Sequence, residues 1–163
     1  MNFEEVYERL FKKVFAYIRS RVRGAEQAED IAARAWQKVW DKQQQFDARR
    51  GTPEQWIFTI ARNEVNKYYK WYLLKRLFSI EREEDISPDV KTPFEALSLQ
   101  ERQTYLFYAL QKLAQREQDL LSLKFYSGLN NRQIARLVGM SESNVGTIVN
   151  RALQKLRAVL EEL

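Results

Sequence analysis

The sequence predicts an all-α protein built from two small helical domains that are joined by a flexible acidic linker. Helix-forming residues dominate from end to end, and only five Gly and three Pro interrupt the 163 residues. Apolar residues recur at spacings of three and four in several segments, which is the period of amphipathic helices. One acidic stretch without this period, residues 79–92, has two of the three prolines in or beside it. We therefore expect a first domain over residues 1–78, a linker over 79–92 and a second domain over 93–163.

Two helices are expected at the start of the first domain. An apolar residue recurs at every fourth position from Val6 to Val22, and Gly24 is expected to end this helix. The second helix begins near Ala25 with acidic residues in its first turns, which suits the positive end of a helix dipole. Trp36 and Trp40, four residues apart, form a large apolar surface on it. Aromatics of this kind belong to the core about twice as often as to an interface.

A loop is expected over residues 43–53, because QQQFDARRGTP contains turn-forming residues and has no helical period. A third helix then begins at Glu54 and runs into the aromatic stretch 68–72. Cations interleaved with aromatics can follow a phosphate backbone while bases stack on the rings. A solvated basic face whose aromatics close the core would explain the same pattern. The polar face of this helix carries Arg62, Asn63, Asn66, Lys67 and Lys70.

The second domain is expected to open with two helices. Thr92, Pro93 and Glu95 form a capping pattern, which predicts that the first begins at Pro93. The second begins around Gln115 and can be closed by Gly128. The apolar residues expected to bury this second helix are Leu120, Leu121, Leu123, Phe125 and Tyr126.

The most informative pattern is a helix-turn-helix over residues 130–156. Gly139 can supply the tight turn after the apolar stripe of NNRQIARLVGM, and Ser141 is a good N-cap for the next helix. Apolar residues at spacings of three and four, from Val145 to Leu160, mark the inner face of that helix. Donors and acceptors that can reach base edges and phosphates in the major groove occupy its outer face, including Ser143, Asn144, Thr147, Asn150 and Arg151.

Composition removes several classes of function. The net charge of +5 favours a polyanionic partner. The absence of Cys and His removes the usual thiolate nucleophile, general base and metal ligands, so we expect no enzyme activity, no metal and no cofactor. No apolar run approaches a membrane span, and the start MNFEEVYERL is unlike a signal peptide. We therefore expect no membrane insertion and a cytoplasmic, nucleoid-associated protein.

Three stretches in this order resemble a known family. They are AED at 28–30 leading to Trp36 and Trp40, WIFTIARNEVNKY at 56–68, and residues 116–157. Together they are similar to bacterial sigma factors of the extracytoplasmic-function group, the minimal two-domain members of the sigma-70 family. In that family the first domain is called region 2, and the second, which ends in the helix-turn-helix, is called region 4.

The resemblance implies that the protein binds core RNA polymerase, directs it to promoter DNA and helps to open the duplex. An anti-sigma factor is implied as a further partner. The residues that match the polymerase-docking helix of the family are Glu29, Asp30, Trp36, Gln37 and Trp40. Those placed at the minus-10 element are Phe46, Arg49, Arg50, Arg62, Asn63, Asn66, Lys67 and Lys70. Those placed at the minus-35 element are Ser143, Asn144, Thr147, Asn150 and Arg151.

The chain departs from the family pattern in both domains. Asn66 stands where Asp is usual, and Tyr69 stands where Arg is usual. In the recognition helix Gly146 and Ile148 replace the common Lys and Arg, which leaves Asn144, Thr147 and Arg151 as the predicted readers of sequence.

Two alternatives stay open at this level. A stand-alone helix-turn-helix regulator would bind duplex DNA without polymerase, usually as a dimer on symmetric half-sites. An interaction protein whose basic faces are merely solvated would bind neither DNA nor polymerase. The acidic linker likewise has two interpretations, a solvated tether or a segment that threads the polymerase near the nascent RNA, as in the family.

Overall fold

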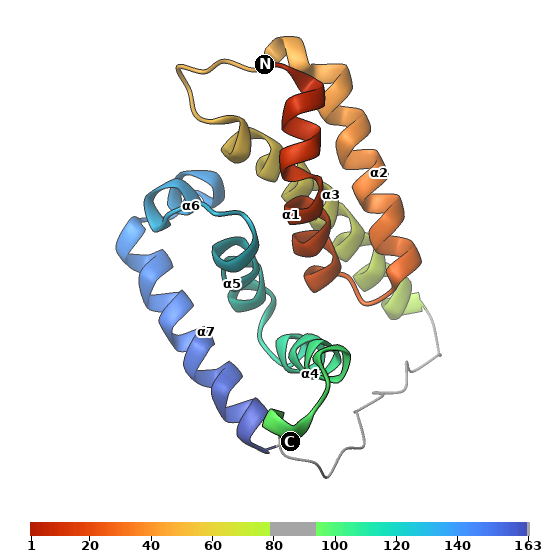
Figure 1. Cartoon of the computed structure of the whole chain (residues 1–163), viewed down its shortest axis with the longest axis vertical. Helices are drawn as coiled ribbons and strands as arrows, with labels where there is room; N and C mark the ends of the chain where they lie inside the picture. The colour runs from red at the N-terminus through yellow and green to blue at the C-terminus, as the bar shows by residue number, and fades with distance from the viewer. Residues whose placement is uncertain (79–93, 163) are drawn as a thin grey trace.

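A computed structural model describes residues 1–78 and 94–162, and this part of the chain is helical without any strand (Figure 1). The all-α prediction is confirmed, whereas the predicted linker lies outside the described residues. None of the described helices is long and apolar enough to cross a membrane. In chain order the α-helices are α1 Phe3–Arg21, α2 Ala25–Lys42, α3 Pro53–Phe78, α4 Leu99–Gln111, α5 Gln115–Tyr126, α6 Asn131–Val138 and α7 Glu142–Glu162, with short 3-10 turns at Gln43–Gln45 and Phe94–Ala96.

The turn between α1 and α2 differs from the prediction. Helix α1 ends at Arg21, and Val22 takes an extended backbone as its C-cap. Gly24, with φ −86°, is the N-cap of α2 and does not end α1. The reason is that the Arg19 guanidinium donates to the carbonyl oxygens of Val22, at 2.9 Å, and Arg23, at 3.2 Å. These bonds hold the chain after Arg21 in a conformation that needs no left-handed glycine, and Gly24 serves as the N-cap of α2.

The expected burial of the two neighbouring tryptophans is correct for only one of them. Trp36 is 6% exposed and packs into the core between α1 and α2. Trp40 is 53% exposed, although it lies only four residues further along α2. The apolar face of α2 is therefore wider than the core that covers it, and part of it remains available to a partner.

The predicted start of α4 is wrong, and its real start shows why. Residues Phe94–Ala96 form a 3-10 turn, and α4 begins at Leu99 after the N-cap Ser98. The Glu101 amide donates to the Ser98 hydroxyl and the Ser98 amide donates to the Glu101 carboxylate, which is a complete capping box. The sequence offers the same Ser/Thr-x-x-Glu pattern twice, six residues apart. Thr92 and Pro93, the earlier pattern's first residues, lie outside the described part.

The helix after α4 follows its predicted bounds but buries fewer residues than expected. Helix α5 begins at Gln115, and Gly128 beyond its end has the left-handed φ of 73° that the prediction requires. Phe125 is wrong as a core residue, because its side chain is 59% exposed. The other four predicted positions are buried or half-buried, since they lie on the sides of α5 that face α1 and α7.

The helix-turn-helix is confirmed in detail. Helix α6 ends at Gly139 in the left-handed conformation, with φ 74° and ψ 37°. The Asn144 amide donates to the Ser141 hydroxyl at 3.2 Å, so Ser141 caps α7 as predicted. The inner face of α7 is buried through its first four predicted positions, Val145, Val149, Ala152 and Leu156.

The N-terminal helices α1–α3 and the C-terminal helices α4–α7 pack against each other. Helix α5 contacts α1 on one side and α7 on the other, and α6 contacts α3 (Figure 1). Buried apolar residues from both groups form one continuous cluster. The two halves thus share a core, and this contact decides which candidate functional surfaces are exposed.

Candidate protein and nucleic-acid interfaces

The outer face of α7 is free to enter a DNA groove. All five residues predicted to read the minus-35 element are exposed. The Thr147 hydroxyl donates to the Ser143 carbonyl one turn earlier, at 3.0 Å, which fixes its orientation on the helix surface. Helix α6 is held in turn by a capping box between Asn130 and Gln133. A rigid helix pair with an exposed polar face is the geometry required for reading base edges in the major groove.

The loop between α2 and α3 is shaped by local hydrogen bonds. Thr52 caps α3, because its hydroxyl accepts from the Gln55 amide at 3.3 Å and the Gln55 side chain accepts from the Thr52 amide at 3.1 Å. Pro53 occupies the first helical position, where a missing N–H costs nothing. The loop residue Phe46 contacts Trp56 of α3, with ring centroids 5.7 Å apart.

A hollow of about 450 Å³ opens beside this loop. Phe46 and Arg50, both in the predicted minus-10 set, line it together with Trp56. An aromatic wall next to a cation suits an unstacked base and its phosphate. Arg136 and Leu137 of α6 also line this hollow, so the C-terminal half closes one side of it.

Arg49 does not line that hollow and is engaged locally. Its guanidinium makes two hydrogen bonds to the Asp47 carboxylate, at 2.9 and 3.0 Å, and its amide makes a third at 3.0 Å. The side-chain bond first and the amide bond second lower the pKa of Asp47. Arg49 is thus paired within the loop with Asp47, which itself lines the hollow.

The predicted contacts on α3 converge in a second hollow of about 510 Å³. Asn63, Asn66, Lys67 and Lys70 all line it. Two further cations from α2, Lys38 and Lys42, line the same hollow. They were not among the minus-10 residues predicted from the sequence. Their spacing of four residues placed them on one face of α2, but nothing in that spacing showed that this face adjoins α3. The result is a basic hollow with amide groups, which suits a polyanion.

A buried carboxylate organises the lysines of this hollow. Glu64 is 4% exposed and accepts a hydrogen bond from the Lys38 ammonium, while Lys67 approaches it at 3.4 Å and Arg34 at 3.8 Å. Burial alone would raise the pKa of Glu64, but the Lys38 hydrogen bond and the charges of Lys38 and Lys67 lower it overall. Glu64 therefore stays ionised and holds the cations in place.

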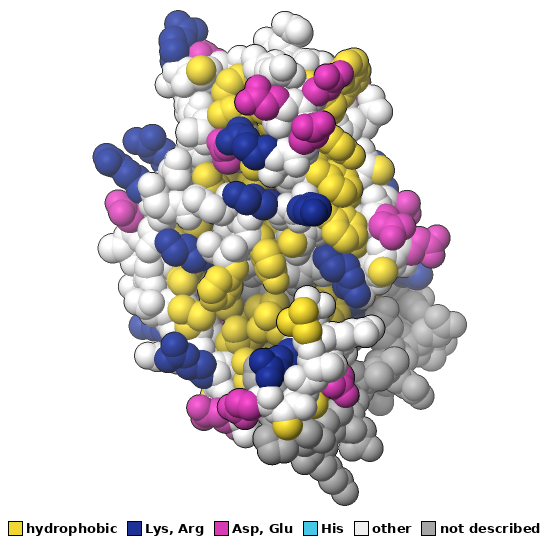
Figure 2. All heavy atoms as spheres, viewed as in Figure 1, with side chains coloured by type: hydrophobic (Ala, Val, Ile, Leu, Met, Phe, Trp, Pro, Cys, Tyr) yellow, Lys and Arg dark blue, Asp and Glu magenta, His cyan; other side chains and the backbone are white. Residues whose placement is uncertain are grey.

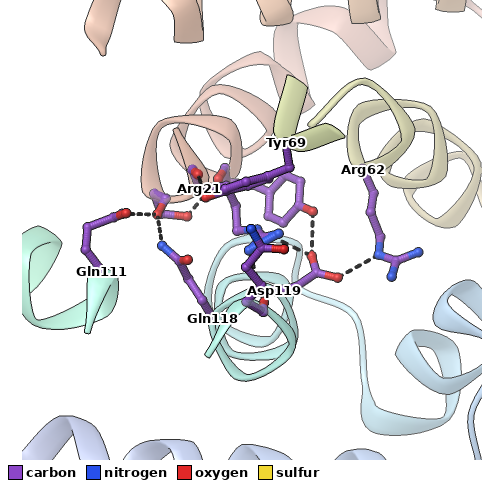
Figure 3. A network of polar contacts seen from close by, with 9 residues as sticks. Arg21, Arg62, Tyr69, Gln111, Gln118 and Asp119 are labelled. Atoms are coloured by element: carbon purple, nitrogen blue, oxygen red, sulfur yellow. Dashed lines mark hydrogen bonds and ion pairs between the residues drawn. The ribbon is translucent and has the colours of Figure 1, made fainter. Parts of the chain in front are cut away.

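Arg62 lies at the contact between the two halves, where Asn66 is the other predicted minus-10 residue. Its guanidinium Nε donates to Asp119 Oδ2 of α5 at 2.7 Å, and its side chain is only 24% exposed (Figure 3). It lines a smaller hollow of about 180 Å³ with Arg21, Arg116 and Asp119. The predicted set of eight residues is thus divided among the hollow beside the loop, the loop itself, the basic hollow on α3 and the contact between the two halves.

The aromatic stretch 68–72 supports both interpretations given above. Tyr69 is half-buried, and its hydroxyl donates to the Arg21 carbonyl oxygen, so it has a structural role. Trp71 is 56% exposed with the Lys75 ammonium 5.2 Å above its ring. Tyr68 stacks on Tyr72 at 6.0 Å between centroids. Only the later part of this stretch is therefore available for stacking on a ligand.

The predicted docking face on α2 is largely exposed. Glu29, Asp30 and Gln37 are exposed, and Trp40 is the large apolar group among them. Trp36 is buried and supports the face from beneath. Aromatics of α1 extend the face and were missed: the Phe3 ring lies 5.0 Å from the Trp40 ring, and the Tyr7 ring lies 4.8 Å from that of Trp36. Exposed aromatics beside acids are typical of a protein-docking surface.

Cationic side chains are spread over both halves. In the view of Figure 2, Lys and Arg lie among apolar groups across the middle of the face, while most Asp and Glu lie towards its rims. Such a distribution attracts a polyanion over an extended length and not at one point.

A helix-turn-helix with an exposed reading face, joined to a second basic helical module with an acidic and aromatic docking face, defines a DNA-binding protein of the transcription machinery. Residues 6–70 match the family described as sigma-70 region 2, and residues 109–158 match the family described as sigma-70, region 4. These matches cover more than half of the chain. The chain belongs to the sigma-70 family and has the two-region form of its extracytoplasmic-function group.

Individual relatives agree with this assignment. The chain is 28% identical over 160 residues to the ECF RNA polymerase sigma factor RpoE of Cereibacter sphaeroides, covering 95% of this chain and 84% of that one. It is 24% identical to the ECF RNA polymerase sigma factor BldN of Streptomyces coelicolor, covering 98% of this chain but only 61% of BldN. The fold is similar to that of the sigma factor RpoE solved with the anti-sigma factor NepR from Bartonella quintana, with a TM-score of 0.76, 23% identity, and 98% and 97% of the two chains covered.

Proposed function

We propose that this protein is a promoter-specificity subunit of bacterial RNA polymerase, with region 2 within residues 1–78 and region 4 within residues 93–163. The observation that carries the proposal is the presence, on one chain, of both matched regions and an exposed reading face on α7. A stand-alone regulator needs only its helix-turn-helix to bind DNA. The match of residues 6–70 to sigma-70 region 2 therefore disfavours that alternative. The polymerase performs the chemistry, and this subunit selects where it starts, on the nucleoid in the cytoplasm.

Region 2 docks on core polymerase through α2. Asp30 supplies charge at the rim, and Trp40 supplies exposed apolar area at the centre. Exposed aromatics give most of the binding free energy at such interfaces, and charges select the partner. The complete proposed set is Glu29, Asp30, Trp36, Gln37 and Trp40, with Trp36 acting by supporting Trp40 from the core.

Region 2 also holds the opened minus-10 element. An unpaired base enters the hollow that Phe46, Arg50 and Trp56 line, and the cost of unstacking it, about a few kcal/mol, is offset there by ring contact. The phosphates follow the basic hollow on α3. The proposed minus-10 residues remain Phe46, Arg49, Arg50, Arg62, Asn63, Asn66, Lys67 and Lys70, to which Lys38 and Lys42 are added.

Region 4 reads the minus-35 element as duplex. Asn144, Thr147 and Arg151 contact base edges from the major groove, while Ser143 and Asn150 contact the flanking backbone. An anti-sigma factor is proposed as a further partner, since a sigma factor of this fold has been solved in complex with one. Such a partner would cover the docking and DNA-binding faces until it is released.

Association with sigma-free core polymerase tests the proposal. The chain should co-elute with core polymerase in size-exclusion chromatography at moderate salt and be displaced by the housekeeping sigma factor. Asp30→Arg combined with Trp40→Ala should weaken this association at least about tenfold. The matched control is Glu161→Arg with Phe125→Ala, an exposed acid and an exposed aromatic outside α2. No co-elution of the wild type with its cognate polymerase would favour the stand-alone regulator instead.

A further inference from the structure

The C-terminal end of α1 is capped by region 4. The last carbonyls of a helix have no partner within the helix and must be satisfied elsewhere. The Ser20 carbonyl oxygen accepts from Gln118 Nε2 at 3.0 Å and from Gln111 Nε2 at 3.4 Å (Figure 3). Arg21 Nη1 donates to the Gln115 carbonyl oxygen at 3.1 Å. Side chains and backbone from α4 and α5 thus complete the hydrogen bonding of a helix in the other half.

A buried carboxylate joins the two halves at the same point. Asp119 of α5 is 5% exposed. Its Oδ1 accepts from the Tyr17 hydroxyl at 2.7 Å, and its Oδ2 accepts from Arg62 Nε at 2.7 Å. Arg21 Nε lies 3.7 Å from Oδ1. A carboxylate is stable in such a place only while these partners remain, and all three belong to region 2.

This arrangement occupies a part of the proposed minus-10 surface. Arg62 cannot contact a DNA phosphate through Nε while it donates that N–H to Asp119. The hollow beside Phe46 is bounded on one side by Arg136 and Leu137 of region 4. Region 4 thus already occupies one N–H of Arg62 and one side of this hollow in the free chain.

We propose that Tyr17, Arg21, Arg62, Gln118 and Asp119 form an intramolecular clasp that holds region 4 against the minus-10 face of region 2, and that a DNA phosphate opens the clasp by replacing Asp119 on Arg62. The proposal rests on the proposed function in the role it gives to Arg62. The exchange is chemically balanced, because carboxylate and phosphate both accept charge-assisted hydrogen bonds from a guanidinium. Apparent affinity for DNA is lowered by the fraction of molecules that are closed.

The distance between the two halves in the free chain tests the clasp directly. The protein has no cysteine, so Glu8→Cys in α1 and Gln154→Cys in α7, both exposed, accept two spin labels without background. Pulsed electron paramagnetic resonance on the full chain should give one narrow distribution of distances between the two spin labels. Asp119→Asn and, separately, Gln118→Ala should add a longer, broader component.

The matched control is Glu117→Gln. Glu117 lies on the same helix and carries the same charge as Asp119, but it pairs with Lys155 inside region 4 at 2.5 Å. The distance distribution of the Glu117→Gln variant should equal that of the wild type. Circular dichroism shows whether each variant keeps its helices, and Gln118→Ala leaves every charge of the clasp in place if Asp119→Asn fails to fold.

Binding of a fluorescent single-stranded oligonucleotide supplies the second arm. At equal salt the Asp119→Asn chain should bind about fivefold or more tighter than Glu117→Gln, which loses the same charge. Added oligonucleotide should also lengthen the wild-type distance. A wild type that is already open, or clasp variants whose distances and affinities equal those of the control, would overturn the clasp. Neither arm uses polymerase, so failure of the clasp is distinguishable from failure to bind polymerase.

Discussion

Glu64 is a single buried side chain whose removal should destabilise region 2. Its side chain is buried while those of Lys38 and Lys67 are 36% and 65% exposed. Glu64→Gln keeps the shape but leaves three cations without a counter-charge. Because the lysines can turn towards water, we expect a loss of about 1–2 kcal/mol in the free energy of unfolding at pH 7. Urea unfolding followed by circular dichroism measures this, with the exposed Glu29→Gln as control.

The pH dependence of the Glu64 effect has a definite sign. The folded pKa of Glu64 lies below its ordinary value of 4.5, so its stabilising effect is fully present above that value. It is lost as the pH falls from about 4.5 through the lower folded pKa. The stability difference between the wild type and Glu64→Gln should therefore shrink as the pH is lowered from about 6 to about 3. A difference that stayed constant over this window would show that Glu64 acts by shape alone.

Tyr17 should give the opposite dependence at alkaline pH. Burial first, and the neighbouring Asp119 charge second, raise the pKa of Tyr17 well above the usual tyrosine value of 10.0. A raised pKa means that the stability is present below about pH 10 and is lost as the pH rises further. Tyr17→Phe should cost about 1 kcal/mol near neutral pH, and this cost should diminish above pH ~10. Exposed Tyr7→Phe is the control, and unfolding at several pH values distinguishes the two variants.

At the element scale, the turn between α6 and α7 makes a prediction about backbone conformation alone. Gly139 has φ +74°, and a Cβ added there would meet nothing within 4 Å. Gly139→Ala should therefore destabilise region 4 by about 1–2 kcal/mol through left-handed strain, not through a clash. Gly146, inside α7, would place a Cβ 3.5 Å from Asn131 Nδ2, an ordinary contact. Gly146→Ala should instead stabilise the helix by about 1 kcal/mol. Thermal unfolding should show shifts of opposite sign, and equal shifts would contradict this assignment.

The elements that could be predicted are those with a local cause. The α6–α7 turn follows from Gly139 and Ser141, and the start of α5 and its end at Gly128 follow from equally local signals. The error at the start of α4 arose because two local signals were equivalent. Ser98 and Thr92 both begin a capping pattern in the sequence. The pattern at Ser98 caps α4, and Leu97, just before it, is buried.

The candidate site was predictable as a set of residues but not as an arrangement. Periodicity placed Arg62 and Asn66 on one face of α3, and that is correct. It could not show that Arg62 meets Asp119, which lies 57 residues further along the chain. Helical spacing predicts which face of a helix a residue occupies. Which other helix packs against that face depends on the tertiary structure. Lys38 and Lys42 were missed for the same reason.

At the scale of the whole molecule, the shared core predicts that regions 2 and 4 unfold together. Buried residues of both regions belong to one cluster, and the clasp adds polar contacts across it. Separation of the regions would expose apolar surface on α1 and α5 as well as the Asp119 carboxylate. Each region is small, and a small core gives little stability by itself. Contact with the other region therefore adds to the free energy of unfolding of each region.

The distribution of tryptophan makes this dependence measurable. All four tryptophans, Trp36, Trp40, Trp56 and Trp71, lie in region 2, so their fluorescence reports unfolding of that region alone. Far-UV circular dichroism reports helices of both regions. In the wild type the two urea transitions should coincide, which is the test for a single cooperative unit. In the double variant Gln118→Ala, Asp119→Asn they should separate, with one region unfolding at lower urea, while Glu117→Gln keeps them together. Two separate transitions in the wild type would mean that the contact between α1 and α5 is too weak to couple the regions, and that each region is held by its own core.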